Sequence, residues 1–426
     1  MHKAFESSDA HRYAAHITPN VQPYAHQRHV AHDRTTKVIP SHQAATMNSY
    51  KHYNEVNSEN NVGGAWQGSS VFNDFIVPQT IQVIEGCWLR FTLKWTSAAS
   101  GDLPVPRPAL QMIDSITYMF ENGNDTQVLR GEVEQLLFVN ETSNEDYARL
   151  AHSYGCHASD RAGVYGFTAA GGANEVVTRT YMVKLGGVLG CSKLFAAGLE
   201  GEPLRIRVNW ASSATTSVGG NAAQTIELQQ SQLVIEETQL AQDDFERLMA
   251  QYRSPNGVQH RFIEQRVSTH PFTCTSGQQL QITTQTHAGL AAGVLVFIRS
   301  QAQSGTGPTS FLALTDAQWF DERNLKLQPK MNDDMLRSVV HRACDFPSNG
   351  AQQVPSYFFP FNLSLHATLQ HAMHTGSLKL SGRDAFHFTC SAAMAAANSG
   401  AIQVEIVSLN YAFLSIQRGR ISVEKS

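Results

Sequence analysis

The chain has 426 residues and a formal net charge of −4, and only 16% of its residues are charged. This charged fraction lies below the roughly 25% of ordinary soluble domains. The chain lacks the excess of Lys and Arg with which proteins wrap nucleic acid, so we expect no direct sequence-specific binding of nucleic acid. No apolar run approaches the roughly 20 residues of a membrane-spanning helix, and the polar N-terminus indicates no signal peptide.

The six cysteines are scattered and form no Cys-x-x-Cys pair: Cys87, Cys156, Cys191, Cys274, Cys344 and Cys390. This spacing argues against a disulfide framework and against a structural zinc site. We therefore expect free, mostly buried thiols in a protein made in a reducing compartment. The few charges, together with many Gly, Ser, Thr, Asn and Gln residues, indicate an all-β chain whose surface is largely covered by partners.

Residues 1–62 differ in composition from the rest of the chain. They hold eight of the 18 histidines and show no dense apolar pattern. Through residue 52 they carry six Lys or Arg residues against three acidic residues. We interpret this segment as an extended, mildly basic, His-rich arm that becomes ordered only against a partner.

The next part of the chain shows the period-two alternation of half-buried strands. Apolar and polar side chains alternate in WLRFTLKW (88–95), in IDSITYMF (113–120) and in LRIRVNW (204–210). The polar sequence ENGND (121–125) follows the second of these strands and is a strong hairpin signal. A further strand is expected in TIELQQSQLVIEE (225–237).

Two short helices are expected among these strands. NEDYARLAHSY (144–154) and QDDFERLMAQY (242–252) place apolar residues at helical spacing. The second helix ends before SPNG (254–257), whose proline and glycine mark the clearest boundary in the chain. We therefore divide the chain after the arm into residues 63–253 and residues 254–426.

The second half begins a new series of β patterns. GVLVFIR (293–299) is an apolar run of strand length, and YFFPFNLSL (357–365) is an aromatic strand in which Pro360 predicts an edge or a bulge. MNDDMLRSVVHRA (331–343) places its apolar residues on one helical stripe. These patterns predict a second β-rich unit with a helix inserted in a connection.

The last predicted strand is IQVEIVSLNYAFL (402–414). Its apolar register slips between Ile406 and Val407, which predicts a β-bulge. The two β-rich halves are of similar size and each has short strands with one or two helices in the connections. This organisation fits two Greek-key sandwiches, and no residue-level repeat relates them.

No set of residues indicates catalysis or a bound cofactor. His366, His371 and His374 have a spacing that does not place three ligands on one side of a helix or strand, and no Cys or carboxylate stands at the usual zinc spacing. The acidic pairs at 243–244 and 333–334 stand at expected helix starts, where carboxylates favour the helix dipole. We therefore expect no catalytic, cofactor-binding or metal-binding residue.

The order of the segments resembles that of a known family. Residues 112–150 are similar to its early strand–turn–helix section, and residues 232–251 to the last strand of a first jelly roll running into a linker helix. Residues 260–267 resemble the opening of a second jelly roll, and residues 354–390 resemble an aromatic strand followed by a Ser/Gly turn. Over about residues 65–416, the chain resembles the double jelly-roll major capsid proteins of the adenovirus, tectivirus and large-DNA-virus lineage.

The resemblance implies an all-β fold of two consecutive eight-stranded jelly-roll sandwiches, with short helices in the connections and an extended N-terminal arm. It implies a major capsid protein whose homotrimers form pseudo-hexagonal capsomers in an icosahedral virion shell, assembled inside the host cell. Neighbouring capsomers and minor capsid or penton proteins are the expected partners, with the surface of an internal membrane as an alternative contact. The resemblance implies no enzymatic activity and no cofactor.

Within the arm, three aromatic residues and three arginines are the expected assembly contacts: Phe5, Arg12, Tyr13, Tyr24, Arg28 and Arg34. Aromatic anchors favour a protein neighbour over the anionic surface of a membrane. Two other functions remain open. One is a β-sandwich carbohydrate-active enzyme, and the other is a trimeric viral spike or receptor-binding (lectin-like) protein.

Overall fold

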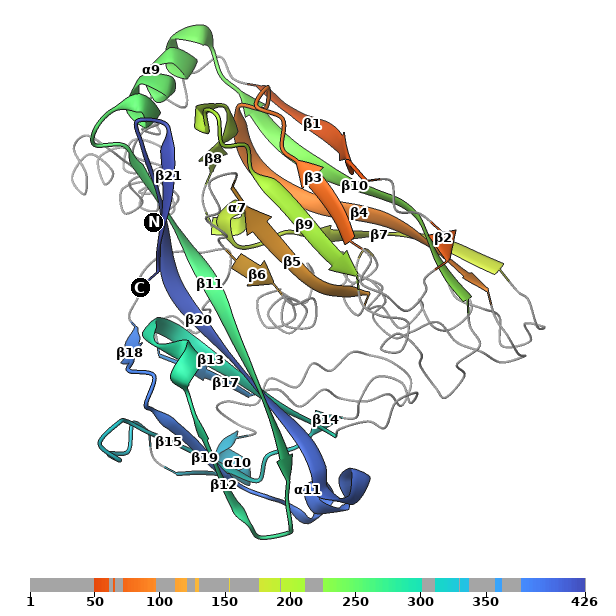
Figure 1. Cartoon of the computed structure of the whole chain (residues 1–426), viewed down its shortest axis with the longest axis vertical. Helices are drawn as coiled ribbons and strands as arrows, with labels where there is room; N and C mark the ends of the chain where they lie inside the picture. The colour runs from red at the N-terminus through yellow and green to blue at the C-terminus, as the bar shows by residue number, and fades with distance from the viewer. Residues whose placement is uncertain are drawn as a thin grey trace, which may run out of the picture.

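The computed structural model describes residues 50–60, 64–65, 72–96, 112–120, 127–129, 153, 176–191, 193–210, 225–300, 311–328, 330–336, 357–361 and 377–425. Figure 1 shows two β sandwiches. The first carries the strands from β1 to β10, and the second carries those from β11 onward. Helix α9 leads from the first sandwich into β11, and the long strands β11 and β20 run side by side along both.

The first sandwich is built from two antiparallel sheets. Its larger sheet has the order β1 (Tyr50–Asn57), β10 (Thr225–Gln239), β4 (Val83–Thr96) and β7 (Val176–Lys184). The facing sheet has the order β3 (Phe72–Ile76), β9 (Arg205–Trp210), β5 (Ile113–Met119) and β6 (Gln127–Leu129). Two short strands, β2 (Gly64–Ala65) and β8 (Leu194–Phe195), pair with β10 and β4. Without these two, the sheets contain strands 1-8-3-6 and 2-7-4-5, which is the order of a jelly roll.

The second sandwich repeats this order. Its larger sheet contains β11 (Val258–Thr273), β20 (Ala401–Gln417) and β13 (Gly289–Ser300), and β17 (Tyr357–Pro360) and β18 (Leu378–Leu380) follow each other along β13. The facing sheet contains β12 (Gln279–Thr283), β19 (Ala385–Thr389), β15 (Asp316–Phe320) and β16 (Met331–Asn332). Strands β14 (Phe311–Leu312) and β21 (Arg420–Lys425) extend the larger sheet. The expected all-β fold of two consecutive jelly rolls is therefore confirmed.

Short helices lie between the strands: α7 (Val188–Cys191), η4 (Ala196–Gly198), α9 (Gln242–Arg253), η5 (Gln285–His287), α10 (Asp333–Met335), α11 (Ala392–Ala396) and η7 (Ala397–Gly400). Helix α9 confirms the expectation for residues 242–252, and it carries acidic residues in its first turn as predicted. The helix expected over 144–154 lies outside the described residues except at Ser153.

The helix expected in residues 331–343 begins at Asp333, so its predicted start at the acidic pair 333–334 is confirmed. Met331 and Asn332 form strand β16, and Met331 pairs with Ala317 of β15. The Asn332 side chain then accepts a hydrogen bond from the Met335 backbone N–H at 3.1 Å, so the helical turn begins only after it. Met335 is exposed, while Leu336 is buried. The residues after 336 in this segment lie outside the described part.

The alternation predicted for the strands of the first sandwich is confirmed. In β4 the side chains of Leu89, Phe91 and Leu93 are fully buried, while those of Arg90 and Thr92 between them are half-buried. A strand that presents alternate side chains to one core produces this pattern. These inward residues belong to the larger cluster of buried apolar side chains, which we call the first core.

The larger sheet of the second sandwich is buried on both faces. In β13, Val296 and Ile298 face the interior of the second sandwich, a cluster that we call the second core. Leu295 and Phe297 lie in the first core. In β20, Val407 likewise lies in the first core. This sheet therefore separates the second core from the side chains of the first jelly roll.

The bulge predicted between Ile406 and Val407 was wrong. Strand β20 pairs with β11 in unbroken register from Ala401 to Ile416. Ile406 is buried in the second core and Val407 in the first core, so two consecutive apolar residues need no change of register. The irregularity in this sheet lies instead in β13, between Ala291 and Gly293.

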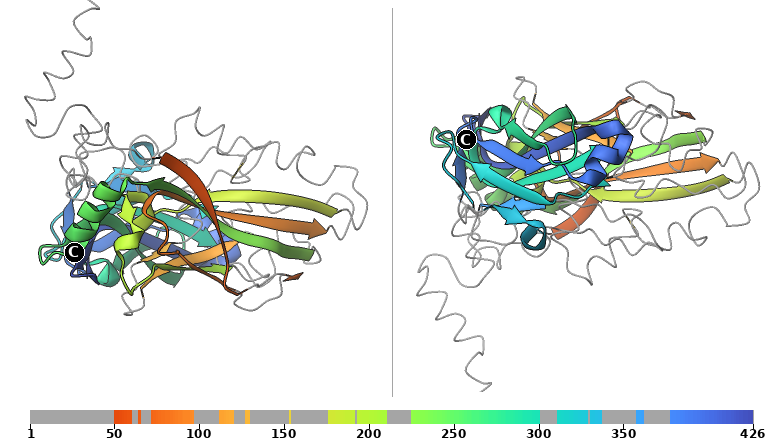
Figure 2. Two further views of the ribbon diagram at one scale, coloured as in Figure 1. Left: turned by 90° about the horizontal axis from the view of Figure 1, so that it is seen from above. Right: turned by 90° about the horizontal axis from the view of Figure 1, so that it is seen from below.

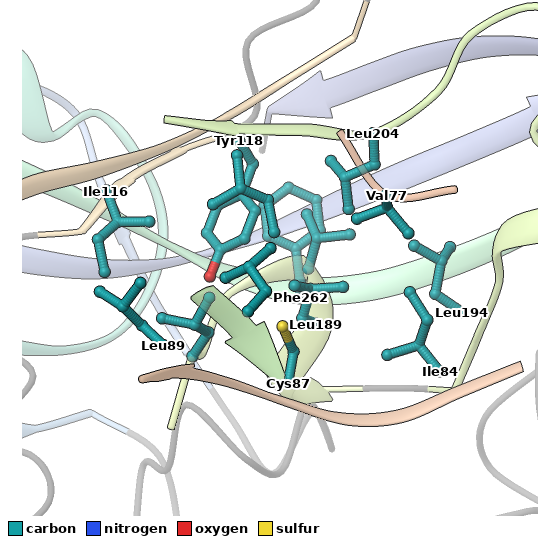
Figure 3. Close-up of a cluster of buried hydrophobic side chains, with 14 of the residues drawn as sticks. Val77, Ile84, Cys87, Leu89, Ile116, Tyr118, Leu189, Leu194, Leu204 and Phe262 are labelled. Atoms are coloured by element: carbon teal, nitrogen blue, oxygen red, sulfur yellow. The ribbon is translucent and has the colours of Figure 1, made fainter. Parts of the chain in front are cut away.

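The first core continues from the first jelly roll into the second. Phe262 of β11 is buried among first-jelly-roll side chains that include Tyr118 and Leu189 (Figure 3). The Tyr118 hydroxyl donates a hydrogen bond to the carbonyl of Gly186 at 3.0 Å, which satisfies its polar end. The two jelly rolls therefore share one apolar core, and they are joined by more than a linker.

Strand β1 was not expected from the sequence. Residues 50–57 fall in the range assigned to the arm, but the structure pairs them with β10 from Tyr50↔Gln239 to Asn57↔Gln232. They form the first strand of the first jelly roll, at the edge of its larger sheet. The range of 1–62 given to the arm is therefore too long at its C-terminal end.

Candidate assembly surface

The residues predicted as assembly contacts lie outside the described part of the chain: Phe5, Arg12, Tyr13, Tyr24, Arg28 and Arg34. The histidines whose metal-binding role was set aside lie outside it as well: His366, His371 and His374. Both interpretations stay predictions. The candidate assembly surfaces within the described residues therefore belong to the two jelly rolls.

Strand β1 is held to its sheet mainly by polar contacts. The Glu237 side chain of β10 is buried, and one of its oxygens accepts a hydrogen bond from the Gln82 backbone N–H at 2.8 Å. The other oxygen lies 3.1 Å from Nε2 of His52 and accepts a hydrogen bond from the Asn54 amide. A buried carboxylate requires such partners, because an unpaired one is strongly destabilising. Glu237 therefore fixes the position of β1 without an apolar alternation in the strand.

The outer face of the same sheet carries two aromatic residues beside each other. Tyr53 is 65% exposed, and its ring centroid lies 6.4 Å from that of Trp88. A Cβ atom at Gly86 would come within 2.8 Å of the Trp88 indole, so the indole lies directly against the backbone of Gly86. We call this outer surface of β1, β10, β4 and β7 the Tyr53–Trp88 face.

Ion pairs continue along the Tyr53–Trp88 face. Arg90 Nη2 lies 2.8 Å from a carboxylate oxygen of Glu55, and Lys94 Nζ lies 3.0 Å from one of Glu227. These pairs are partly exposed, so each contributes little to folding. Figure 2 shows the parts of β7, β4 and β10 that extend side by side away from the second sandwich. Of the residues on this face, the aromatic side chains and Arg90 are of the kinds enriched in protein interfaces.

The second jelly roll presents one large apolar side chain on a fixed turn. Leu325 is 61% exposed and follows β15. The Asp321 carboxylate accepts hydrogen bonds from the backbone N–H groups of Arg323 at 2.9 Å and Leu325 at 2.7 Å. Asn324 has a positive φ of 59°, which closes the turn. This turn holds Leu325 outward, exposed to solvent in the single chain.

A buried histidine lies between two serines in the second jelly roll. His287 Nε2 is 2.7 Å from the Ser268 hydroxyl, and His287 Nδ1 is 2.8 Å from the Ser408 hydroxyl. His287 is completely buried, and burial lowers its pKa to about 4. A catalytic serine–histidine pair must be reachable by substrate and must take up a proton near neutral pH. This arrangement instead satisfies polar groups inside the sandwich.

Neither a metal-binding cluster nor a membrane-spanning helix occurs in the described ranges. Within these ranges, no three His, Cys, Asp or Glu side chains gather in a way that could hold a metal ion. Among the same residues, no helix has both the length and the apolar character needed to cross a membrane.

The sequence patterns missed the Tyr53–Trp88 face. The half-buried strand predicted over residues 88–95 is confirmed, but the alternation by itself assigns no role to the outward side chain of Trp88. Tyr53 was included in the arm. Exposed and half-buried residues alternate along residues 50–57, as expected of an edge strand. This alternation becomes evident only once the strand is paired with β10.

Two jelly rolls in tandem, with equivalent strand orders and a shared core, define the double jelly-roll class of protein. Among solved structures, a chain of the PBCV-1 virus capsid has 12% sequence identity and a TM-score of 0.62, over 89% of this chain and 97% of that chain. The Faustovirus major capsid protein has 9% identity and a TM-score of 0.57, over 87% and 91%. A chain of Sulfolobus turreted icosahedral virus has 10% identity and a TM-score of 0.51, over 85% and 90%.

These similarities establish the fold, because they extend over most of both chains at very low sequence identity. No protein-family model matches the sequence, and a comparison with curated proteins finds no match. The arrangement of strands, and not the residue sequence, relates this chain to the viral capsid structures.

Proposed function

We propose that this chain is the major capsid protein of an icosahedral virus and that three copies form a pseudo-hexagonal capsomer. The observation that carries the proposal is the repetition of one strand order in two jelly rolls of a single chain. Three such chains supply six sandwiches, and six similar units around one axis give a hexagonal outline that can tile a shell. Closed symmetric oligomers of this kind are the usual assemblies of soluble proteins.

The proposal includes a revised division of the chain. The first jelly roll begins at β1 and ends with α9, and the second begins at β11 and continues to the C-terminus. The N-terminal arm then covers residues 1–49. The shared core supports a rigid protomer, since Phe262 of the second jelly roll is 1% exposed among residues of the first.

We place the contact with a second copy on the Tyr53–Trp88 face. Within one chain, the outer face of β20 and β13 is buried against the first jelly roll, as Leu295 and Val407 of the first core illustrate. The Tyr53–Trp88 face is the equivalent surface of the first jelly roll, and in a single chain it leaves Tyr53 65% exposed. If the second jelly roll of another copy contributes the cover, three copies close a ring in which both large sheets are covered.

The polarity of this face supports an association that forms between folded chains. Its ion pairs Arg90–Glu55 and Lys94–Glu227 stay solvated in the single chain, unlike the apolar side chains of β13. Aromatic and arginine side chains at the centre of an interface supply much of its binding free energy. The ion pairs of this face therefore keep the free chain soluble, and its aromatic and arginine side chains provide contacts for a neighbouring copy.

For the arm, we propose contacts with protein neighbours in the shell, through Phe5, Tyr13 and Tyr24. Neighbouring capsomers and minor capsid or penton proteins are the partners that fit these aromatic anchors. Arg12 and Arg28 leave an anionic membrane surface as the second candidate. In this proposal the protein resides in the virion shell and is assembled inside the host cell.

The test of this function is the native mass and shape of the purified protein. We expect a stable species of about three times the 46.9 kDa chain mass in native mass spectrometry. Electron microscopy of that species is expected to show particles with a hexagonal outline. A protein that stays monomeric at micromolar concentration, or a trimer with a compact head and a stalk, would contradict the proposal. The second result would instead favour a spike.

A further inference from the structure

The larger sheets of the two jelly rolls share one irregularity in their strand pairing. In the first jelly roll, β4 has an extra residue, Glu85, where its pairing with β10 shifts after Glu236. In the second jelly roll, β13 has an extra residue, Ala292, where its pairing with β20 shifts after Leu409. Because a slip of one residue moves every side chain to the opposite face, these two bulges define which residues of the two sheets correspond.

The side chains next to the two bulges correspond as well. Gly86 and Gly293 directly follow the extra residues. A Cβ atom at Gly86 would come within 2.8 Å of the Trp88 ring, and one at Gly293 within 2.6 Å of the Phe358 ring. Trp88 is half-buried, whereas Phe358 is 5% exposed in the first core. The same arrangement is therefore covered in the second jelly roll and partly open in the first.

On the neighbouring edge strands, Tyr50 of β1 corresponds to Phe262 of β11. Tyr53 and Gln265 pair with the residues at the two bulges, and Tyr50 and Phe262 stand three residues before them in unbroken register. Phe262 is 1% exposed because the first jelly roll covers it, whereas Tyr50 is 61% exposed. The position that joins the two jelly rolls within the chain therefore carries an exposed aromatic residue on the first jelly roll.

The Tyr50 side chain is held in place although it is exposed. Its ring stacks on that of His52, with the two ring centroids 5.6 Å apart. Its hydroxyl donates a hydrogen bond to the side-chain oxygen of Gln239 on β10. A side chain that is already fixed loses little conformational entropy when a partner covers it. Tyr50 is therefore suited to be an aromatic anchor of an interface.

The surface that would receive Tyr50 follows from the residues around Phe262. Figure 3 shows Phe262 in one cluster with Ile84 of β4 and with Leu194 of β8, which is fully buried and pairs with Ile84. In the second jelly roll, Ala291 stands at the position of Ile84 beside the bulge, and it pairs with Leu378 of β18. Leu378 is therefore the counterpart of Leu194, but it is only half-buried.

We propose that Tyr50 of one copy packs against Leu378 of the next copy, at the position that corresponds to the contact of Phe262 within its own chain. The junction between copies then repeats the junction between the two jelly rolls of one copy. Such a contact is head-to-tail, and it closes a ring when the rotation between copies closes. This contact rests on the proposed function, because it needs a second copy, and it lies at the end of β1 beside the Tyr53–Trp88 face.

The experiment places the photoreactive amino acid p-benzoylphenylalanine at position 50 of the full-length protein, where it keeps an aromatic ring. Irradiation is expected to join chains, so that a denaturing gel shows bands at two and three times the chain mass of 46.9 kDa. Peptide mapping by mass spectrometry is expected to find the link on the peptide that contains Leu378. The control carries the same amino acid in place of Leu325, which is 61% exposed, and is expected to give no link to β18.

Two substitutions separate a contact between copies from a role in the folding of β1. Tyr50→Ala is expected to weaken self-association by about tenfold in analytical ultracentrifugation, whereas Tyr50→Phe keeps the ring and is expected to keep most of the affinity. Hydrogen–deuterium exchange in residues 51–57 of the monomer is expected to match that of the wild type. Weaker association together with faster exchange along β1 would assign Tyr50 to the folding of β1 and overturn the contact.

The outcomes also distinguish this contact from the proposed function. A trimer whose photo-cross-links all stay within one chain, or join chains away from the second jelly roll, would overturn the contact and leave the capsomer intact. A trimer that Tyr50→Ala leaves as stable as the wild type would do the same. A wild-type protein with the native mass of one chain would contradict the capsomer itself, and the contact together with it.

Discussion

Ile406 and Val407 are consecutive residues of β20, and their side chains lie in two different hydrophobic cores. Successive side chains of a strand point to opposite faces of its sheet. Here both faces are covered, one by the sheet that completes the second jelly roll and the other by the first jelly roll. This relationship makes the larger sheet of the second sandwich the wall shared by the two halves of the protomer.

Because the two jelly rolls share this sheet, a substitution in it is expected to destabilise the first jelly roll as well. Phe262→Ala is expected to lower the free energy of unfolding by about 3–5 kcal/mol, because it leaves a cavity in the first core. Hydrogen–deuterium exchange is expected to increase in β5 and α7 of the first jelly roll as well as in β11. The control is Phe388→Ala, which removes an equally buried ring from the second core. Unchanged exchange in β5 and α7 of the Phe262 variant would contradict the shared core.

The buried histidines predict a loss of stability in mild acid. Burial lowers the pKa of His287 to about 4, with the nearby positive charges of His270 and Arg266 adding to the effect, and burial also lowers the pKa of His270. Above the unfolded pKa of about 6.5, His287 is neutral in both states and has no effect on stability. As pH falls below that value, the unfolded chain binds the proton and the folded chain does not. For His287 the expected loss reaches up to about 3 kcal/mol by pH 4.

The measurement is the urea-unfolding free energy of the wild type and of His287→Gln as a function of pH. Glutamine keeps a donor and an acceptor for Ser268 and Ser408 but has no proton to bind. The variant is expected to lose less stability than the wild type between pH 6.5 and pH 4. Parallel pH profiles for the two proteins would show that His287 does not contribute to the acid sensitivity.

The Tyr53–Trp88 face predicts a substitution that separates subunits without unfolding them. Tyr53→Asp changes a side chain that is 65% exposed. The variant is therefore expected to be a folded monomer with the circular dichroism spectrum of the wild type and a cooperative thermal transition. Placing a charge at the proposed subunit contact is expected to weaken self-association at least tenfold in analytical ultracentrifugation. Leu325→Asp is the control, because it makes the same kind of change at a 61% exposed site of the other jelly roll. If Tyr53→Asp stays as trimeric as the wild type, the contact lies elsewhere.

The position of β1 predicts two different outcomes for two deletions. Removal of residues 1–49 is expected to leave a folded, trimeric protein that forms shells poorly, because the proposed arm contacts are lost. Removal of residues 1–57 also deletes β1 and leaves the buried Glu237 without His52 and Asn54, so this variant is expected to aggregate or to lose several kcal/mol of stability. Expression yield, native mass and particle counts by electron microscopy distinguish the two. A stable trimer after the longer deletion would show that β1 is dispensable for the first jelly roll.

The strands that could be predicted from the sequence are those with one buried face. Leu89, Phe91 and Leu93 alternate with polar residues and lie in the first core, and the same pattern holds for Ile206 and Val208. The end of α9 was also predictable, because Pro255 disfavours continuation of the helix and the chain turns after it into β11. In these segments the local pattern and the tertiary environment agree.

The segments that were missed are those in which polar contacts or a second core replace the usual alternation. Strand β1 turns two polar residues, His52 and Asn54, and only one apolar residue, Val56, toward the core. It is positioned by the carboxylate of Glu237, which lies 185 residues from His52 in the sequence and opposite it in the sheet. The apolar run around Ile406 resembles a bulge in sequence because its consecutive apolar residues enter two different cores. The Tyr53–Trp88 face could not be predicted from a local pattern, because its two aromatic residues come from different strands.

The sequence by itself determined the all-β class, the two halves and most of the inward-facing residues, because the period of two follows directly from strand geometry. Only the tertiary structure decided which core each face enters and where the first jelly roll begins. Those features depend on contacts between residues far apart in the chain, such as that of Glu237 with His52. A local pattern can specify that a side chain is buried, but only the packing of the sheets specifies against what it is buried.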